Sequence, residues 1–439
     1  MHTIAIDCGA SFIKAALFDD HGGITSQVQK ISPVVHGSED VLQTVQITAL
    51  VPIVRQILSD FVRNVSKAKL CISNEMHGFI LAYADGTPFT DYISWQKEYG
   101  AIKIDGKSSV DMLLEGQFSD DIIHTGMQLR GGLPSSNVLY LSRSGILKKA
   151  KSKLFFYTLG DYLIKALFGI EPMCHPTNAA ATGLYDVVET GWNERLKNAC
   201  CAKEILFPKI GTKAVEIVFE NCELQVFPAI GDQQAALLGA GLASETDLSF
   251  NLGTGAQVSK PVKNIDFSNR WQIRPYFNGF YLKTIPHLPS GRALNVYIRF
   301  FKELLQGFCD NVSNENIWGF LLAKESECSE TSLHCDLSFF QNAVTDYTVG
   351  SISNIDEYGL SVGCLMKSLF SQMIDNFLSA AMVIEPLPKA VKRIIFSGGV
   401  AKRIESIRGG IMQTYYGADV LPLIENETLY GLYKISGVL

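Results

Sequence analysis

One carboxylate, Asp232, is the strongest candidate for chemistry in this sequence. It follows Gly231, between a strand-like segment (Leu224–Phe227) and a run of small residues that favours a helix. A carboxylate at such a turn can accept a proton from a substrate hydroxyl. Helix N-capping is the competing interpretation of Asp232 alone, so its meaning depends on the other turns of the chain.

The segment Asp7–Lys14 contains a second carboxylate and a glycine at the end of a short apolar strand. Gly9 would let backbone N–H groups approach phosphate oxygens, and Asp7 could hold Mg²⁺ through water. An ordinary β-turn closed by Asp and Gly is the alternative.

Two glycine-rich turns in the second half of the chain are suited to a nucleotide. Gly253, Thr254 and Gly255 offer flexible backbone and a hydroxyl donor for β- and γ-phosphates, or else form a hairpin turn. Gly398 and Gly399 follow a strand and open a helical run, where a ribose or base could lie against the backbone. Tight packing of that strand on that helix is the alternative.

Two further features need weighing. Gly106-Lys107-Ser108 lacks the spacing of a P-loop, so we do not expect one there. His77 follows a strand-like segment, and loops after strands are where α/β proteins bind ligands. A buried structural histidine is the default alternative.

The composition excludes several classes of protein. The chain has 439 residues, of which 47% are hydrophobic and 19% charged, enough for two or three domains with large cores. Formal net charge is −6 and no basic tract stands out, which argues against a nucleic-acid or acidic-membrane partner.

We expect neither a secretory signal nor a cysteine-based metal or redox motif. The N-terminus lacks a basic region followed by a long apolar run, and no stretch reaches the roughly 18 apolar residues that span a bilayer. Ten cysteines are scattered without a C-x-x-C motif, so neither a zinc framework nor a redox motif is indicated. We expect a soluble, cytoplasmic protein with free thiols.

Strand-like and helix-like segments alternate along the chain, which is typical of an α/β protein. Apolar spacing predicts three main helices: Val41–Val65, with Pro52 as an irregularity, Leu159–Phe168 and Tyr358–Ile384. It predicts strands at Ile4–Asp7, Ile13–Phe18, Lys69–Ser73, Asp247–Leu252 and Arg393–Ser397.

Both halves of the chain open with a strand, a glycine-containing turn and a second strand. These are Ile6–Gly9 with its following strand and Asn251–Gly255 with its own. We therefore place a domain boundary between Gly241 and Asp247, giving domains at 1–242 and 243–439.

Taken together, these motifs resemble the FGGY family of carbohydrate kinases, within the superfamily of actin, hexokinase and the heat-shock chaperones. The resemblance spans almost the whole chain. It is carried by Asp7–Lys14, Glu75-Met76-His77-Gly78 (usually Gln-Met-His-Gly in the family), Trp95, Gly160–Leu163, Asn178–Asp186, Gly231–Ala235, Gly253-Thr254-Gly255, Gly398-Gly399 and Ala401-Lys402.

Some stretches are similar to the sedoheptulokinase branch, and one departs from the family. The similar runs are Asn251–Gln257, Arg274–Asn278 and Leu288–Leu294. Family kinases often carry Asp and Arg shortly after the tryptophan, whereas this chain has Gln96 followed by Lys97-Glu98-Tyr99. That departure bears on the identity of the sugar more than on phosphoryl transfer.

The resemblance implies an α/β fold of two actin/hexokinase-like (ribonuclease H-like) domains with mixed sheets and an active-site cleft between them. It implies ATP and Mg²⁺ as cofactors, sugar binding in the N-terminal domain and nucleotide binding in the C-terminal domain. The implied roles are: Asp232 as catalytic base; Met76, His77, Trp95, Gln96, Asp232 and Gln233 in sugar binding; Asp7, Gly9, Lys14, Gly253, Thr254, Gly255, Gly291, Gly398, Gly399 and Lys402 in nucleotide binding; and Asp7 and Asp232 near the metal.

The expected substrate is a small ketose phosphorylated on a primary hydroxyl, with sedoheptulose favoured. Xylulose, ribulose or another polyol stays open, and so does a sugar-binding homologue with impaired catalysis, because of Lys97-Glu98-Tyr99. A chaperone-like ATPase of the superfamily is disfavoured by Met76, His77 and Trp95. Neither nucleic acid nor membrane is expected as a partner, and a homodimer is compatible with this assignment.

Overall fold

The computed structural model describes residues 1–35, 44–45, 47–201, 205–253, 255–307, 313–345 and 347–438. Contacts divide the chain into two compact units. Unit 1 comprises Met1–Ala240, Asn264–Tyr281 and Glu425–Leu439, and unit 2 comprises Gly241–Lys263 and Leu282–Ile424. The domains expected at 1–242 and 243–439 are continuous stretches, whereas unit 1 takes two segments from the second half of the chain.

A mixed sheet forms the centre of unit 1, in the order β12-β13-β6-β1-β2-β3, with β14 also paired to β6. Strand β1 pairs antiparallel with β2 and parallel with β6, and β13 and β14 both run parallel to β6. The strands are β1 (His2–Cys8), β2 (Phe12–Phe18), β3 (Ile24–Ile31), β6 (Lys67–Asn74), β12 (Val215–Phe219), β13 (Cys222–Val226) and β14 (Ile230–Gly231).

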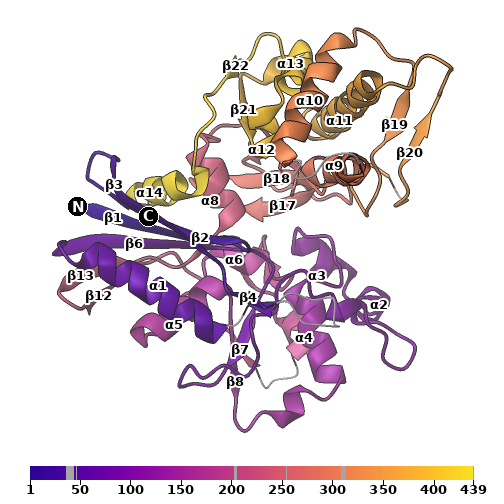
Figure 1. Cartoon of the computed structure of the whole chain (residues 1–439). Helices are drawn as coiled ribbons and strands as arrows, with labels where there is room; N and C mark the ends of the chain where they lie inside the picture. The colour runs from indigo at the N-terminus through magenta and orange to yellow at the C-terminus, as the bar shows by residue number, and fades with distance from the viewer. Residues whose placement is uncertain are drawn as a thin grey trace. The chain divides into compact units, whose positions relative to one another are not determined.

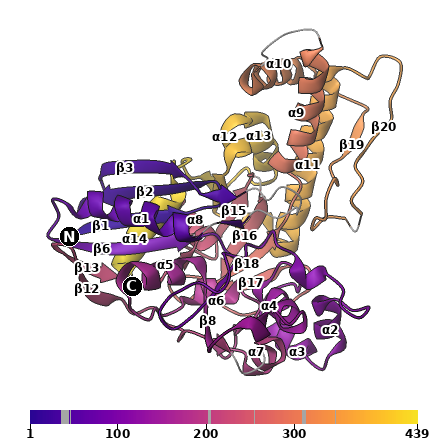
Figure 2. The ribbon, with the colours of Figure 1, turned by 60° about the horizontal axis from the view of Figure 1, so that its bottom comes forward.

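Helices cover both faces of this sheet, as Figures 1 and 2 show. Side chains alternate along β1, so Ile4 and Ile6 pack with α1 (Ile47–Val62) and α5 (Leu159–Phe168). Ala5 points to the opposite face and packs with α8 (Asp232–Gly239) and α14 (Glu427–Val438). Each face of β1 is therefore buried, as the continuous apolar run of that strand requires.

The remaining elements of unit 1 are short and are not strands of this central sheet. They are β4 (Val34–Val35), β5 (Thr44–Val45), β7 (Ile80–Ala82), α2 (Ser109–Glu115), α3 (Ser119–His124), α4 (Pro134–Arg143), β8 (Leu154–Tyr157), α6 (Pro176–Ala180), β9 (Tyr185–Asp186), β10 (Gly191–Trp192), α7 (Glu194–Cys201), β11 (Ile205–Leu206) and β17 (Gln272–Pro275). Short 3₁₀ turns lie at Tyr99–Ala101 and Leu147–Lys149.

Two of the predicted helices start later than the sequence suggested. Helix α1 begins at Ile47 rather than Val41, because Thr44–Val45 pair as a strand with Val34–Val35. Pro52 is accommodated inside this helix. Val41 lies outside the described residues.

Helix α11 (Val362–Ile384) begins four residues after Tyr358, because the Ser361 side chain accepts a hydrogen bond from the Cys364 N–H and caps the helix. The predicted helix Leu159–Phe168 and the predicted strand Arg393–Ser397 have the bounds of α5 and β21.

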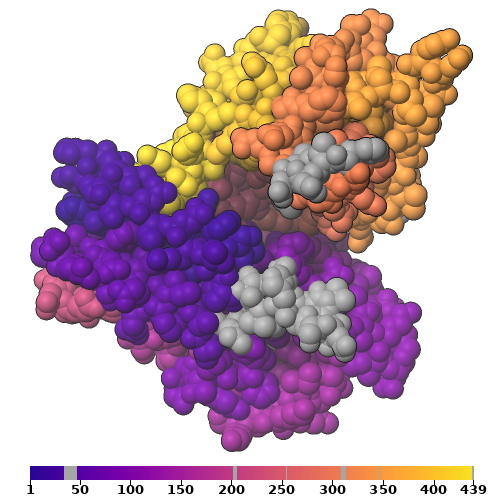
Figure 3. Space-filling model, in the orientation of Figure 1, coloured from indigo at the N-terminus to yellow at the C-terminus, as the bar shows by residue number. Residues whose placement is uncertain are grey.

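The strands of unit 2 lie in the order β18-β16-β15-β21-β22. The orange segment of unit 2, which includes α10, lies at the surface of this unit on the face drawn in Figure 3. The elements are β15 (Asp247–Asn251), β16 (Gln257–Val262), β18 (Tyr281–Pro286), α9 (Gly291–Gln306), α10 (Asn314–Glu327), β19 (His334–Asp336), β20 (Ser351–Ser353), α11, the 3₁₀ turn Pro388–Ala390, β21 (Arg393–Ser397), α12 (Gly399–Arg403), α13 (Glu405–Thr414) and β22 (Asp419–Val420).

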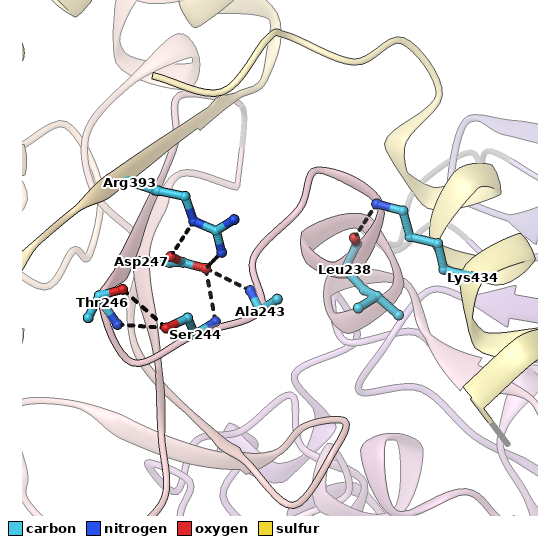
Figure 4. Close-up of polar contacts among 7 residues, drawn as sticks. All are labelled: Leu238, Ala243, Ser244, Thr246, Asp247, Arg393 and Lys434. Carbon is cyan, nitrogen blue, oxygen red and sulfur yellow. Dashed lines mark hydrogen bonds and ion pairs between the residues drawn. The ribbon is translucent and has the colours of Figure 1, made fainter. Parts of the chain in front are cut away.

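An ion pair between the buried Asp247 and the partly exposed Arg393 fixes the start of β15 in unit 2 (Figure 4). Arg393 on β21 donates to both oxygens of Asp247, at 2.8 Å from Nε and 2.6 Å from Nη2. The backbone N–H groups of Ala243 and Ser244 donate to Asp247 Oδ2, each at 2.9 Å. This fully buried carboxylate thus has four donors, which meets the cost of its desolvation.

Close glycine contacts join α8 to α14 within unit 1. A Cβ on Gly239 would lie 1.7 Å from the carbonyl oxygen of Glu427, and one on Gly431 would lie 1.8 Å from that of Ala235. Lys434 Nζ donates to the carbonyl oxygens of Leu238 and Gly239 at the end of α8, the first of which Figure 4 shows. The last helix of the chain therefore holds the helix that begins at Asp232.

None of the helices within the described ranges is long and apolar enough to cross a lipid bilayer.

Candidate active site

Three carboxylates follow neighbouring parallel strands of unit 1. Ser73 on β6 pairs in register with Asp7 on β1, and also with Ile230 on β14. The residues at or just beyond these strand ends are Asp7, Glu75 and Asp232. Because the carboxyl ends of parallel strands meet at one edge of a sheet, the register brings these side chains together.

Asp232 is the first residue of α8, and its side chain is half-buried. The Gln233 N–H donates to its Oδ1 at 2.8 Å. Burial, followed by the charges of Asp7 and Glu75, raises the pKa of Asp232 to about 8, against the lowering effect of Gln233 and Arg274. A carboxylate with such a pKa is a stronger base than an ordinary aspartate.

Asp7 lies opposite Lys14 in the β1–β2 hairpin, and Gly9 forms the turn between them. The Ser73 hydroxyl donates to Asp7 Oδ1 at 2.8 Å. Burial raises the pKa of Asp7 to about 6, partly offset by this hydrogen bond and by the charge of Lys14. The hairpin thus combines an acid, a cation and a tight glycine turn, as predicted from the sequence.

Glu75 is buried at the end of β6, and Tyr92 lies against it. The Tyr92 hydroxyl donates to Glu75 Oε2 at 3.4 Å, and Trp95 also donates to this carboxylate. Burial raises the pKa of Glu75 to about 7, partly offset by these two donors. Gly78 leaves room for Tyr92, because a Cβ there would lie 2.1 Å from the tyrosine oxygen.

Met76 packs against the catalytic loop predicted from the sequence, and His77 lies against Ala181, the C-cap residue of α6. The Met76 sulfur would contact a Cβ on Gly231 at 2.9 Å, so Met76 packs directly against the residue before Asp232. His77 has a positive φ of 65°, and its Nδ1 hydrogen-bonds to the Ala181 carbonyl oxygen at 2.8 Å. This strained backbone and fixed ring are the kind of arrangement found at binding sites.

Trp95 carries a guanidinium on its ring, since Arg130 Cζ lies 5.8 Å from the ring centroid. Burial lowers the pKa of Arg130, against the raising effect of Glu98, and Arg130 Nε has no hydrogen-bond partner among the described residues. Gln96 is half-buried, and its N–H donates to Ser94 Oγ at 3.1 Å.

Of the two charged residues that follow Gln96, only Lys97 is buried. Lys97 is buried, with Nζ 5.5 Å from the centroid of the Tyr99 ring, whereas Glu98 is exposed. The Lys97 carbonyl oxygen accepts from Asn137 Nδ2 at 2.8 Å. Lys97 therefore has a packing role on Tyr99.

Arg274 is the second guanidinium of this site, and it is buried. It donates to Gln233 Oε1 and, through Nε at 3.1 Å and also Nη2, to Gln272 Oε1. Burial and then the charge of Arg130 lower the pKa of Arg274 to about 9, against the raising effect of Asp232. Arg274 thus links the amide beside Asp232 to β17.

In unit 2, two of the glycine turns predicted from the sequence touch each other. Gly398 has a φ of 88°, and a Cβ there would lie 2.6 Å from the Gly253 nitrogen. The Gly291 N–H donates to the Gly253 carbonyl oxygen at 3.3 Å, at the start of α9. Only glycine fits at position 398, because both its backbone conformation and the space exclude a side chain.

Gly253 and Gly291, together with Gly399, line a cavity of about 240 Å³ in unit 2. Trp318 forms a wall of the cavity, and Arg403 Cζ lies 5.6 Å from the centroid of its ring. An aromatic face, a cation and bare backbone amides suit the base and phosphates of a nucleotide. The lining residues are Gly253, Gly291, Asn295, Trp318, Gly399, Val400, Arg403 and Ile404.

The other described residues of unit 2 that were predicted to bind nucleotide do not line this cavity. Gly255 is exposed in the turn between β15 and β16, and Lys402 is exposed on α12. Thr254 lies outside the described residues.

The donors present fit a metal that is held mainly by the nucleotide. Within the part of the chain that the structure describes, no three His, Cys, Asp or Glu side chains are grouped closely enough to hold a metal ion. Asp7 and Asp232 nevertheless repel each other, and the charge of each would be relieved by a nearby cation. These two carboxylates would therefore contact the metal through its water ligands and not as direct ligands.

Sequence reasoning missed several of these side chains. Tyr92, Arg130, Asn295, Trp318 and Arg403 carry no recognisable spacing, and only the fold brings them to their sites. Two signals could have been found: Glu75 stands where the family usually has Gln, and Arg274 is in a run that resembles the sedoheptulokinase branch.

Comparison with known proteins agrees with this geometry. Residues 2–241 match the N-terminal domain of the FGGY family of carbohydrate kinases. Human sedoheptulokinase is 21% identical over 283 residues, which cover 60% of this chain and 59% of that protein. A glycerol kinase of Rhizobium meliloti (strain 1021) is 25% identical over 272 residues, covering 58% of this chain and 53% of the relative. These alignments thus span little more than half the length of either relative.

Solved structures match almost the entire chain. A xylulose kinase from Rhodospirillum rubrum has a TM-score of 0.84 at 15% identity, covering 100% of this chain and 90% of the other. A ligand-bound xylulose kinase from Lactobacillus acidophilus has a TM-score of 0.80 at 18% identity, covering 98% and 88%. The predicted α/β fold of the actin and hexokinase type, with mixed sheets, is confirmed. The family model accounts for more than half of the sequence, and the chain belongs to the FGGY family of carbohydrate kinases.

Proposed function

We propose that this protein is an ATP-dependent carbohydrate kinase that phosphorylates a primary hydroxyl of a small ketose, with sedoheptulose favoured. The observation that carries the proposal is the convergence of Asp7, Glu75 and Asp232 at one edge of the unit 1 sheet. Only one of the three needs to act as a base, and Asp232 has the highest pKa.

In the proposed mechanism, Asp232 accepts the proton of the sugar hydroxyl as its oxygen bonds to the γ-phosphorus of ATP. The bond from that phosphorus to the bridging oxygen breaks, and ADP leaves. Positioning and charge neutralisation supply most of the rate in such transfers. Gln233, held by Arg274, would keep the start of α8 in place.

The charges of the phosphates need partners. Lys14 would face the phosphoryl group from the β1–β2 hairpin, and the N–H groups around Gly9 would contact its oxygens. Mg²⁺, when bound to the nucleotide, would neutralise phosphate charge, and Asp7 and Asp232 would hold its water ligands.

The nucleotide would bind in the cavity of unit 2. Trp318 and Arg403 would contact the adenine, and Gly253 and Gly399 would let the backbone approach ribose and phosphate. Thr254 and Gly255 complete the phosphate-binding turn in this proposal, and Lys402 follows the glycine pair.

The sugar would bind against Met76, His77 and Trp95, with Gln96 as a further polar contact. Arg130 on the Trp95 ring and the Glu75–Tyr92 pair add hydrogen-bonding groups to this wall. The similarity to human sedoheptulokinase supports a ketose over other sugars. Xylulose and ribulose are the next candidates, and the cytoplasm, where ATP is made, is the proposed place of action.

A sugar acid is a second candidate substrate. Arg130 Nε has no hydrogen-bond partner among the described residues, and Arg274 lies close enough for the two charges to interact. Two guanidinium groups can bind a carboxylate in a bidentate manner. A gluconate kinase from Lactobacillus acidophilus has the same fold, with a TM-score of 0.80 at 19% identity.

The test is ADP release with Mg-ATP, measured side by side for sedoheptulose, xylulose, ribulose, glycerol and gluconate. We expect the highest kcat/KM for sedoheptulose, because a site built for several hydroxyls rejects shorter polyols. If glycerol or gluconate leads by more than about tenfold, the ketose assignment is wrong and the kinase assignment stands.

A variant of the proposed sugar site and a matched control variant extend this assay. His77→Ala should raise KM for the sugar far more than KM for ATP, whereas His124→Ala, a partly exposed histidine of α3, should change neither. If no acceptor gives ADP release above the rate of Asp232→Asn, the protein does not phosphorylate any of these five compounds.

A further inference from the structure

We propose that Cys328 and Cys364 form an oxidation site, in which hydrogen peroxide joins the two thiols in a disulfide that weakens nucleotide binding in unit 2. The two Sγ atoms lie 3.1 Å apart. A disulfide bond is about 2.05 Å long, so the sulfurs need to approach by only about 1 Å. The effect on the nucleotide rests on the function proposed above, whereas the disulfide itself does not.

The helix ends that carry the thiols are packed against each other. Cys328 is the C-cap residue of α10, and Cys364 lies in the first turn of α11. A Cβ on Gly363 would lie 2.4 Å from the Lys324 carbonyl oxygen and 3.3 Å from Cys328 Cβ, so only a glycine permits this contact. An ion pair of 3.2 Å between Lys367 and Glu325 joins the same two helices. The pair of thiols is therefore held in place from both sides.

Both thiols are partly exposed, unlike the buried thiols of Cys8, Cys71, Cys174 and Cys200. Hydrogen bonds from Ser361 and Cys328 lower the pKa of Cys364, while burial and the neighbouring Cys364 raise the pKa of Cys328. The start of the 23-residue helix α11 also favours an anion at Cys364. Cys364 is thus the thiolate that attacks first, and Cys328 is the thiol that resolves.

The chemistry balances with peroxide as the oxidant. The Cys364 thiolate attacks one oxygen of H₂O₂, which breaks the O–O bond, forms a sulfenic acid and releases hydroxide that takes up a proton to become water. The Cys328 sulfur then attacks the Cys364 sulfur, the S–O bond breaks, and the Cys328 proton leaves with the hydroxyl group as a second water. Two electrons pass from the sulfurs to one peroxide molecule.

The same helix connects the thiols to the nucleotide cavity. Trp318 lines the cavity from α10, ten residues before Cys328, which corresponds to about 15 Å along the helix. The guanidinium of Arg403 stacks on Trp318 from α12. The disulfide would draw the end of α10 toward α11. Because α10 moves as a rigid unit, Trp318 would shift relative to Arg403. We expect weaker binding of ATP and no change in sugar binding.

The experiment uses the full chain, reduced and then treated with hydrogen peroxide. Peptide mapping without reductant should find a disulfide between Cys328 and Cys364, and dithiothreitol should reverse it. Calorimetry with ATP should show a dissociation constant raised by about threefold or more after oxidation. Cys328→Ser and Cys364→Ser should each abolish both effects, and Cys335→Ala, a buried cysteine of the same unit, should keep both.

The outcomes separate the parts of the proposal. If peroxide gives no Cys328–Cys364 disulfide in the folded protein, the oxidation site is refuted. A disulfide that leaves ATP affinity unchanged refutes the link through α10. If the reduced protein does not bind ATP at all, the nucleotide part of the proposed function fails, while the disulfide is still decided by the peptide map.

Discussion

The guanidinium of Arg274 donates a hydrogen bond to the side-chain oxygen of Gln233, the residue next to Asp232. Arg274 comes from β17, and Gln233 and Asp232 from the first turn of α8. Its positive charge is among the influences that lower the pKa of Asp232 against burial and two carboxylates. Arg274 therefore bears on both the position and the ionisation of the proposed base.

Replacing Arg274 by Met should move the acid limb of the pH profile of kcat/KM to higher pH. The pKa of Asp232 rises further without the charge, and the base is active only when ionised. We expect kcat/KM at pH 7 to fall by about tenfold or more, with a smaller loss at pH 9. Arg274→Lys keeps the charge, so its limb should stay near that of the wild type. An unchanged limb in Arg274→Met would show that the arginine acts only through packing.

Replacing Glu75 by Gln should have the opposite effect. The amide keeps the shape of the carboxyl group and removes a negative charge that raises the pKa of Asp232. Glu75, with a pKa of about 7, carries this charge only near and above neutral pH. The acid limb should therefore move to lower pH, and kcat/KM at about pH 7.5 should rise by about twofold. The measurement is a pH profile beside that of Glu223→Gln, an exposed carboxylate of β13 whose loss should leave the limb in place. A limb that moves upward would refute the role given to Glu75.

Asp232→Asn should lose kcat by about 10²- to 10⁴-fold with little change in sugar affinity. The same variant should be more stable than the wild type in alkaline solution. A carboxyl group with a raised pKa stabilises the fold below its unfolded pKa, and this stability is lost as the pH rises through the folded pKa, here about 8.

Urea unfolding at pH 5 and pH 9 measures this second effect. The gain of Asp232→Asn in free energy of unfolding should be about 2 kcal/mol at pH 9 and smaller at pH 5. Asp7 and Glu75, with pKa values of about 6 and 7, should make the wild type itself less stable as the pH rises from 5 to 9. More than half of wild-type kcat in the variant would exclude Asp232 as the base.

Gly398→Ala should destabilise unit 2, and Gly399→Ala should be tolerated. A methyl group at position 398 meets the backbone of Leu252 and Gly253 at a positive φ, whereas one at position 399 meets nothing within 4 Å. We expect a cost of about 2–4 kcal/mol for the first and below about 1 kcal/mol for the second. Thermal unfolding of both variants measures the difference, and equal melting temperatures would contradict the packing described.

Trp318→Ala should raise KM for ATP by about tenfold and leave KM for the sugar unchanged. The indole forms a wall of the unit 2 cavity and a platform for Arg403. Phe320→Ala is the matched control, because Phe320 lies on the same helix and is 51% exposed. Equal KM values for ATP in the two variants would show that the adenine of ATP does not bind against Trp318.

The sequence predicted the helices and strands whose own residues carry both the apolar spacing and the signal that ends the element. Leu159–Phe168 has helical spacing and ends at Gly169, which adopts a left-handed conformation. Arg393–Ser397 is an apolar run closed by two glycines. In contrast, β14 has only two residues, and its pairing with β6 depends on contacts made far away in the chain.

The candidate site was predictable where one short motif carries it. Asp7, His77, Asp232 and the glycine turns each stand in such a motif, although their roles stay predictions. Arg130 and Arg274 could not be placed by spacing, because they are separated by 144 residues and meet only through the fold. The shift of the Asp232 pKa depends on three segments at once, and no single window of sequence contains them.

The contact between α8 and α14 has a consequence for synthesis of the protein. The ribosome completes α8 almost two hundred residues before α14, and Gly239 cannot find Gly431 until then. In the meantime the apolar face formed by Ala5, Phe18 and Leu238 lacks its cover. Until α14 is synthesised, this face stays exposed on the nascent first unit, which favours aggregation of partly made chains.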